Sequence, residues 1–576
     1  MQILPRLKEY SKKDGQFVFP KGITTRIDVD VKENGCYLDS LSAVYNDYFK
    51  QTTSTKLSIE EGEALIKARK IDSDIKEYYE IVINEKNIDV YYTDKLSLRN
   101  AVSTIISLIE QDKKTVYINC AKIKDYPEYS HRGILIDIAR RYVPMDEFKM
   151  HIRNLALCKY KYIHWHLSDG AFGYEVKCYT QINDLAERRL YTQEELKELV
   201  SYAESFGIES IPEIDVPAHS SYLNKALPEI FCEIEENRNT SKRISKYVIC
   251  ASNPKSYEVI TNIFKELCEI FTGEYFHIGG DELYFYDLEY TSLFPEWQNC
   301  SRCKELARRE NFESDLDTYI YFINKVNKIV KSLGKKTIMF NDAVDISKPT
   351  KLDKDIIIQF WRVAMEGRGP VEGCSMQGFL DQGFKVINSY FPETYMCDFV
   401  KEENLKKWTP ISNPKVENGR EEQILGSELC AWGVHNHFDY SMLPILYYFS
   451  DRVWNNAEME CSEEIDKAFV RQTISHKIDT VNIFEILNSR IPPLNDYDKF
   501  FYDKVDKDLE KIEKAISSLT KLYQTGLGEV RAIRGYLYVL QELRNVLRKE
   551  QNLPMVDTTL WGFISENQLK KEGKMR

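Results

Sequence analysis

The feature that most constrains the fold is a repeat of short apolar runs, each followed by a helical or loop segment, between residues 133 and 432. Two of the intervening segments, 193–207 and 314–334, are amphipathic and end at a glycine, which is the usual stop of a helix. Eight strand-then-helix units predict an α/β fold, a (β/α)8 TIM barrel, with several extended loops. The eight runs are GILIDIA (133–139), YIHWHL (162–167), IESIPEI (208–214), EYFHIGG (274–280), KTIMFN (336–341), IIIQFW (356–361), FKVINSY (384–390) and ILGSELCAW (424–432).

The segments on either side of the repeat have different patterns. Before it, residues 78–93 alternate like a hairpin and residues 96–111 carry an apolar helical face, which predicts an α+β module. After IPPL (491–494), two apolar stripes at helical spacing flank TGLG (525–528) and predict a helical hairpin, which packs either on the barrel or on a second subunit of a homodimer. We therefore predict three domains: 1–126, an N-terminal α+β accessory domain; 127–494, a catalytic (β/α)8 barrel; and 495–576, a C-terminal helical domain.

Composition narrows the function class. The net charge of −12 argues against nucleic acid as the main partner. The first residues are charged and no run of eighteen apolar residues occurs, so we expect no membrane association and a cytoplasmic location. The thirteen cysteines form no recognisable disulfide framework. Cys300 and Cys303 make a single CxxC without a second pair at zinc-site spacing, so no metal is expected there.

The stretch FHIGGDELYF (276–285) places two carboxylates, Asp281 and Glu282, directly after a glycine pair and an apolar run. A glycosidase that uses two carboxylates places them on opposite sides of the scissile bond, which adjacent residues cannot do. Adjacent carboxylates suit a substrate-assisted reaction, in which the sugar's 2-acetamido oxygen attacks C1 while one carboxylate orients that group and the other transfers the proton. Since chemistry in this fold occurs at the carboxyl ends of the strands, the pair is a candidate catalytic centre.

Four separated motifs carry a resemblance to a known family: HRGILIDIARRYVP (131–144), YIHWHLSD (162–169), SIPEIDVPAH (210–219) and FHIGGDEL (276–283). With them, the chain resembles the family 20 glycoside hydrolases, the β-N-acetylhexosaminidases. The resemblance implies a hydrolase of carbohydrate metabolism that removes terminal non-reducing β-linked N-acetylglucosamine or N-acetylgalactosamine from a glycan or oligosaccharide. It also implies an exo-acting, retaining reaction through an oxazolinium intermediate, with no cofactor.

The resemblance also assigns roles to individual residues. Asp281 would orient the acetamido group and Glu282 would be the acid/base. The predicted substrate-binding residues are Arg132 on the sugar hydroxyls O3 and O4, Asp169 and His219 as a relay to Glu282, Trp361 and Trp432 as pocket walls, Tyr395 on the acetamido oxygen, and Asp398 near O4 and O6. Val434 stands where the family's eighth-strand motif usually has glutamate.

Two alternatives remain open from the residues alone. His164 and His166 share a strand face and could bind zinc in an amidohydrolase-like barrel. The chain could also be a non-catalytic sugar-binding barrel, although the presence of both Asp281 and Glu282 favours an enzyme.

Overall fold

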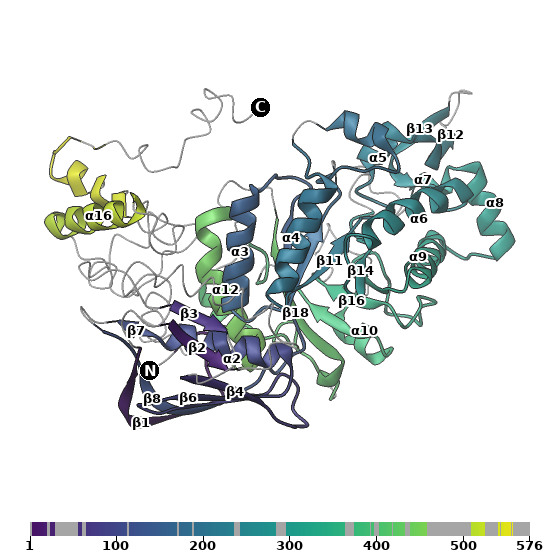
Figure 1. Ribbon diagram of the computed structural model, residues 1–576. Coiled ribbons are helices and arrows are strands. Elements are labelled where there is room, and N and C mark those ends of the chain that lie inside the picture. Colours follow the sequence, from purple (N-terminus) through teal and green to yellow (C-terminus); the bar gives the residue numbers. More distant parts are fainter. Residues whose placement is uncertain are drawn as a thin grey trace.

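Eight parallel strands close into a barrel in the order β10-β11-β14-β15-β16-β17-β18-β9, which confirms the predicted TIM barrel (Figure 1). Parallel strands are covered on both faces, and all seven residues of β9 are buried accordingly. Each strand coincides with one of the eight apolar runs. Their bounds are β9 His131–Asp137, β10 Tyr162–His166, β11 Glu209–Glu213, β14 Tyr275–His277, β15 Lys336–Phe340, β16 Ile357–Phe360, β17 Val386–Asn388 and β18 Ile424–Ala431.

The computed structural model describes most of the first 457 residues and part of the C-terminal region. The described residues are 3–19, 24–28, 56–59, 65–111, 115–169, 172–186, 189–235, 242–283, 295–362, 374–391, 393–396, 402–417, 419–432, 438–457, 508–524, 540–541, 543–545, 547–554 and 556. Among them, no helix is both long enough and apolar enough to cross a membrane.

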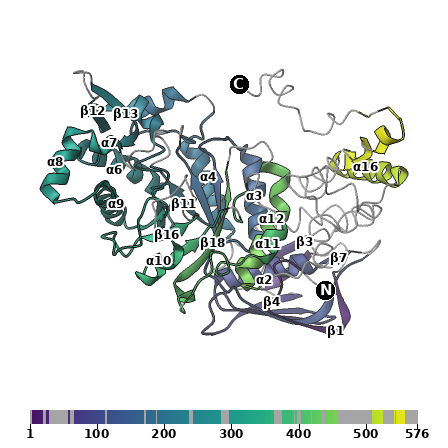
Figure 2. The same ribbon diagram turned by 180° about the vertical axis from the view of Figure 1, so that it is seen from behind.

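Helices follow the strands and lie on the outside of the barrel (Figures 1 and 2). Helix α4 shows why they form where they do: the Thr192 side chain and Glu195 make a reciprocal capping box at its start, and Leu196, Leu199 and Val200 are buried on one face. The helices that follow barrel strands are α3 Met145–Leu157, α4 Gln193–Ser205, α6 Pro254–Cys268, α9 Asp315–Ser332, α10 Met376–Asp381, α11 Glu402–Lys407 and α12 Phe438–Asn455.

The two longest connections between barrel strands are those that follow β11 and β14. Their extra elements gather at one end of the molecule, on the right of Figure 1. After β11 come α5 Ser221–Ala226, η2 Pro228–Ile230 and the antiparallel pair β12 Phe231–Glu235 and β13 Lys242–Ile249; after β14 come α7 Pro295–Gln298 and α8 Ser301–Glu310. Both connections begin at strands whose ends carry candidate catalytic residues.

The N-terminal module is a mixed sheet in the order β1-β8-β5-β6-β4-β2-β3, with β7 paired to β8. The predicted hairpin is the antiparallel pair β5–β6. Helix α2 (Lys95–Leu108) contacts both β5 and β6 on one side and α3 of the barrel on the other, so residues 97–108 are all buried. The strands are β1 Glu9–Val18, β2 Thr24–Asp28, β3 Lys56–Ile59, β4 Ile66–Lys70, β5 Tyr79–Ile83, β6 Ile88–Tyr92, β7 Glu110–Gln111 and β8 Val116–Asp125.

The C-terminal region contains α16 (Leu509–Gln524), which buries Ile512 and Ile516 of the first predicted stripe. Leu540, Leu543 and Leu547 of the second stripe are also helical and buried. The TGLG break and the predicted boundary at residue 494 lie outside the described residues, so the three-domain division stays a prediction.

Candidate active site

Asp281 and Glu282 follow β14 through a turn that only glycine allows. Gly279 and Gly280 both have positive φ, at +67° and +90°. A Cβ on Gly279 would lie 2.0 Å from Asp215 Oδ1, while the Gly280 N–H donates to the same oxygen over 3.0 Å. The glycine pair therefore lets the chain pass close enough to Asp215 to place the next two carboxylates at the carboxyl end of the barrel.

Glu282 is held in an unusual backbone conformation. Its φ is +51°, in the left-handed region, and its N–H donates to Asp342 Oδ2 over 3.1 Å. Its carboxylate oxygens lie 3.5 Å from His219 Nε2 and 3.8 Å from Arg362 Nη1. The side chain is 26% exposed, against 13% for Asp281, so Glu282 is the more accessible of the two carboxyl groups.

A chain of charged groups leads from Glu282 into the barrel wall. His219 lies between the pair and Asp169, with Nδ1 3.2 Å from Asp169 Oδ2 and Nε2 3.7 Å from Asp281 Oδ2. Asp169 in turn pairs with Arg140. Burial alone would lower the pKa of His219, but the neighbouring carboxylates of Asp215 and Asp281 outweigh it and raise that pKa well above its ordinary value. His219 is therefore an imidazolium that can donate from both ring nitrogens.

The environment of Asp169 shifts its pKa downward, whereas the pKa of His219 is shifted upward. Burial by itself would raise its pKa, but hydrogen bonds from His166 and His219 and the charge of Arg140 lower it well below the ordinary range. Asp169 therefore stays ionised and anchors His219.

Asp281 and Asp215 form a buried acidic pair. Burial raises the pKa of Asp281 to about 7; the charge of His219 opposes this rise, and Asp342 and Glu282 add to it. Burial and the nearby charge of Asp281 raise the pKa of Asp215 well above its ordinary value. Two carboxylates this close share a proton. Apart from that proton, Asp281 Oδ1 is buried with no hydrogen-bond partner among the described residues.

An aromatic wall stands beside the carboxylates. Trp361 stacks on Tyr395 with ring centroids 5.7 Å apart, and Tyr395 packs against Trp432 at 5.9 Å. The Trp361 Nε1–H donates to Asp342 Oδ1 over 3.0 Å, which links this wall to the residue that holds the Glu282 backbone. The charges of Asp281 and Glu282 help raise the pKa of Tyr395 after burial, so its phenol is near both. The structure thus brings together the three predicted aromatic residues.

The prediction for Arg132 is corrected. Arg132 lies near the start of β9, at the opposite end of the strand from the carboxylates. Its guanidinium pairs with Glu77 of the N-terminal module at 2.6 Å, donates to the Lys159 carbonyl, and lies 5.2 Å from the Trp454 ring. A residue near the amino end of a barrel strand lies at the end of the barrel opposite the active site. At that end, Arg132 joins the N-terminal module to the barrel.

Arg140 is the arginine that lies at the active end. It follows β9, pairs with both Asp137 and Asp169, and places its guanidinium 5.4 Å from the Trp432 ring. The motif 131–144 contains both Arg132 and Arg140, and their positions relative to the strand end distinguish them. Asp398 and Val434 lie outside the described residues, so the role of Asp398 near O4 and O6 stays a prediction.

The histidines of the zinc alternative lie in a buried network inside the barrel. His164 Nδ1 is 2.9 Å from Glu428 Oε2, and His164 Nε2 is 3.1 Å from Glu213 Oε2. His166 Nδ1 bonds the same Glu213 oxygen at 2.5 Å, and His277 Nδ1 is 3.3 Å from Oε1. These ring nitrogens face carboxylates that stabilise the barrel interior, away from the exposed edge of Glu282.

A barrel whose active end carries two adjacent carboxylates, a charged histidine relay and an aromatic wall is that of a glycoside hydrolase. The sequence comparisons agree. The model of the glycosyl hydrolase family 20 catalytic domain matches residues 129–457, and the model of that family's domain 2 matches residues 1–126. The chain belongs to glycosyl hydrolase family 20, as its motifs indicated, and the amidohydrolase alternative is wrong.

Individual relatives have low sequence identity to this chain but match it over most of its length. The β-hexosaminidase subunit A2 of Dictyostelium discoideum is 26% identical over 401 residues, which cover 67% of this chain and 69% of that protein. The Flavobacterium johnsoniae chitobiase structure has 21% identity and a TM-score of 0.68, covering 97% of this chain and 94% of its own. The Vibrio harveyi exo-β-N-acetylglucosaminidase, solved with N-acetylglucosamine, also has 21% identity and a TM-score of 0.68, covering 82% and 76%.

Proposed function

We propose that this glycoside hydrolase is an exo-acting β-N-acetylhexosaminidase, which removes terminal β-linked N-acetylglucosamine or N-acetylgalactosamine with retention of configuration. The observation that carries the proposal is the buried Asp281 carboxylate beside the more exposed Glu282. Apart from the proton that it shares with Asp215, Asp281 Oδ1 has no donor among the described residues, and the carboxylate lies near the Trp361–Tyr395–Trp432 wall. An acetamido group has the matching parts, because its N–H fills a buried acceptor and its methyl group packs against aromatic rings.

The first step breaks the glycosidic bond. Glu282, as the accessible acid, gives its proton to the glycosidic oxygen as the bond to C1 breaks. The acetamido carbonyl oxygen attacks C1 from the opposite face and forms the oxazolinium ring. Ionised Asp281 accepts the N–H and stabilises the positive charge that develops on that ring, which is electrostatic stabilisation by a group already in position.

The second step returns the catalyst to its starting state. Glu282, now a carboxylate, takes a proton from a water that attacks C1 and opens the oxazolinium ring. Two inversions at C1 give net retention. His219 lies within 3.5 Å of Glu282 and 3.7 Å of Asp281, so as an imidazolium it offsets the negative charge that both carboxylates carry during the cycle.

Arg140 is a further candidate for sugar recognition. Asp137 and Asp169 hold its guanidinium at the active end, with one face against Trp432. A planar guanidinium fixed in this way can donate two parallel hydrogen bonds to neighbouring hydroxyls of a pyranose ring.

The test compares two chromogenic substrates that differ only at C2, an aryl N-acetyl-β-glucosaminide and the matching aryl β-glucoside. We expect turnover of the first, loss of at least about 10³-fold in kcat/KM on the second, and the β-anomer as the first product by NMR. Comparable rates on both, or α-anomer as the first product, would exclude the proposal. Tight binding of N-acetylglucosamine without turnover would instead support the non-catalytic sugar-binding alternative.

A further inference from the structure

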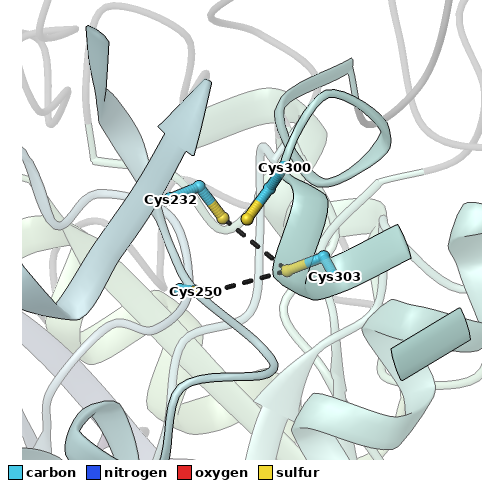
Figure 3. Close-up of side chains that lie close together, drawn as sticks. All are labelled: Cys232, Cys250, Cys300 and Cys303. Carbon is cyan, nitrogen blue, oxygen red and sulfur yellow. Dashed lines mark hydrogen bonds between the residues drawn. The ribbon is translucent and has the colours of Figure 1, made fainter. Parts of the chain in front are cut away.

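Four cysteines converge in the two extended connections, away from the catalytic carboxylates. Cys232 belongs to β12, Cys250 follows β13, and Cys300 and Cys303 stand at the start of α8. Figure 3 shows the sulfurs of Cys232, Cys300 and Cys303 close together, with a dashed line from Cys303 to Cys250. All four are buried and none forms a disulfide.

The sulfur positions match a tetrahedral metal site. Cys303 Sγ is 3.8 Å from Cys232 Sγ and 3.6 Å from Cys250 Sγ, and the four sulfurs all lie within 4.8 Å of one another. Four thiolates at the Zn–S distance of ~2.3 Å have S···S edges of about 3.8 Å. A disulfide has its two sulfurs ~2.05 Å apart and involves only two cysteines, so it does not explain why four sulfurs lie close together.

The surroundings of the cluster suit thiolates. Cys300 is the N-cap of α8 and Cys303 is the third residue of that helix, where the unpaired N–H groups and the helix dipole stabilise negative charge. Arg302 lies between them, and its guanidinium is near Cys300 and Cys250. A tetrathiolate zinc complex has a net charge of −2, which Arg302 and the helix N-terminus partly offset.

We propose that Cys232, Cys250, Cys300 and Cys303 bind one structural Zn²⁺ ion. Sulfur-only tetrahedral donor sets select zinc among the common divalent ions, and a closed set of four protein ligands leaves no position for substrate. This proposal departs from the sequence-based prediction that no metal is bound there. The sequence pattern does not reveal the cluster, because only Cys300 and Cys303 have zinc-site spacing, whereas Cys232 and Cys250 lie fifty or more residues before Cys300.

The ion would connect the two loops that carry the catalytic machinery. The loop after β11 contains His219, and the loop after β14 contains Glu282, each a few residues beyond the end of its strand. The described parts of the two loops also contact each other directly: Ile234 bridges to Cys300, the Trp297 Nε1–H donates to the Ile249 carbonyl over 3.0 Å, and the Arg302 guanidinium donates to the Phe231 carbonyl over 3.2 Å. A four-ligand metal site adds a cross-link between the loops, which limits the motion of both chain segments next to the active site.

The first experiment measures metal in the full-length protein purified under reducing conditions. Elemental analysis should find about one zinc per chain, and X-ray absorption should give four sulfur ligands at ~2.3 Å. Titration with a mercurial thiol reagent should release the ion and lower Tm. A zinc content near zero after anaerobic incubation with Zn²⁺, bound iron instead of zinc, or a nitrogen- or oxygen-rich shell would overturn the proposal.

The second experiment locates the ion. Cys303→Ser should reduce the zinc content from about one ion to under about a tenth per chain. Cys120→Ser, at a buried cysteine of the N-terminal module, is the matched control and should keep full zinc. Equal zinc in both variants would refute the site even if activity were unchanged. If Cys303→Ser does not fold, the sulfur shell of the unmodified protein still decides the question.

Discussion

Replacing Asp281 by asparagine tests how much folding stability the buried carboxylate costs and how much catalytic activity it provides. The buried carboxylate is held close to Asp215, and burial raises its pKa from 3.8 to about 7. Asparagine has almost the same shape and stays neutral at every pH. The substitution should therefore remove activity and at the same time stabilise the fold at alkaline pH.

The magnitude follows from the pKa. A difference of one pKa unit corresponds to ~1.36 kcal/mol, so ionising Asp281 in the folded state costs up to about 4 kcal/mol. Because the folded pKa is raised, the cost is absent below the unfolded value of 3.8, grows as the pH rises, and is complete above about 7. Between pH 5 and pH 8 the asparagine variant should gain about 3 kcal/mol relative to the unsubstituted protein. The loss of the Asp281 charge also relieves Asp215, which adds to the gain.

Denaturant unfolding, followed by tryptophan fluorescence at pH 5 and pH 8, measures this difference for both proteins. Comparing two pH values cancels any packing change that asparagine causes. Asp381→Asn, at an exposed position at the end of α10, is the control and should show no such pH-dependent gain. The reasoning is refuted if Asp281→Asn changes the stability by the same amount at both pH values. In activity, the variant should lose about 10²- to 10³-fold in kcat, because its amide cannot offset the oxazolinium charge.

Three further predictions concern catalysis. Glu282→Gln should reduce kcat/KM by about 10²- to 10⁴-fold on substrates with poor leaving groups and much less on activated aryl glycosides; equal losses on both would contradict its role as the acid. Arg140→Lys should reduce kcat/KM by about 10- to 100-fold, because the lysine ammonium cannot form the paired hydrogen bonds of a guanidinium. Arg132→Lys should instead lower Tm and leave kcat/KM unchanged. A loss of kcat/KM in the Arg132 variant and not in the Arg140 variant would restore the assignment of Arg132. As the pH falls, kcat/KM should decrease near pH 7, where Asp281 takes up a proton. The corresponding decrease in kcat should occur at lower pH, because the acetamido N–H of the bound substrate stabilises the Asp281 carboxylate. A decrease in kcat at the same or higher pH would argue against that contact.

The barrel was predictable because its signal is repeated. Runs such as 133–139 and 356–361 are apolar except for one residue each, Asp137 and Gln359, as is typical of strands covered on both faces. Eight such runs in alternation with helical or loop segments leave few other folds. The helix over 96–111 was also predicted, but its single apolar face did not show that both sides would be buried between the sheet and α3. That outcome depends on how two domains pack, which no local pattern records.

The site was predictable where a motif and a strand end coincide. Asp281, Glu282, Asp169 and His219 come together as expected, because each follows a barrel strand. Arg132 was misassigned because the motif alone does not say which of its arginines faces the active end.

Two further features of the structure could not be predicted from residue spacing. Asp342 holds the Glu282 backbone and the Trp361 indole through contacts between different strands. The four-cysteine cluster likewise depends on two long loops folding against each other.

The most direct test of the central claim varies the nucleophile that the substrate is thought to supply. A series of aryl β-glucosaminides with acetyl, fluoroacetyl, difluoroacetyl and trifluoroacetyl groups on nitrogen makes the carbonyl oxygen progressively less nucleophilic while hardly changing its size. If that oxygen attacks C1, kcat should fall steeply and continuously along the series. A kcat that is insensitive to fluorination, or a sugar found esterified to a carboxylate of the protein, would contradict the account.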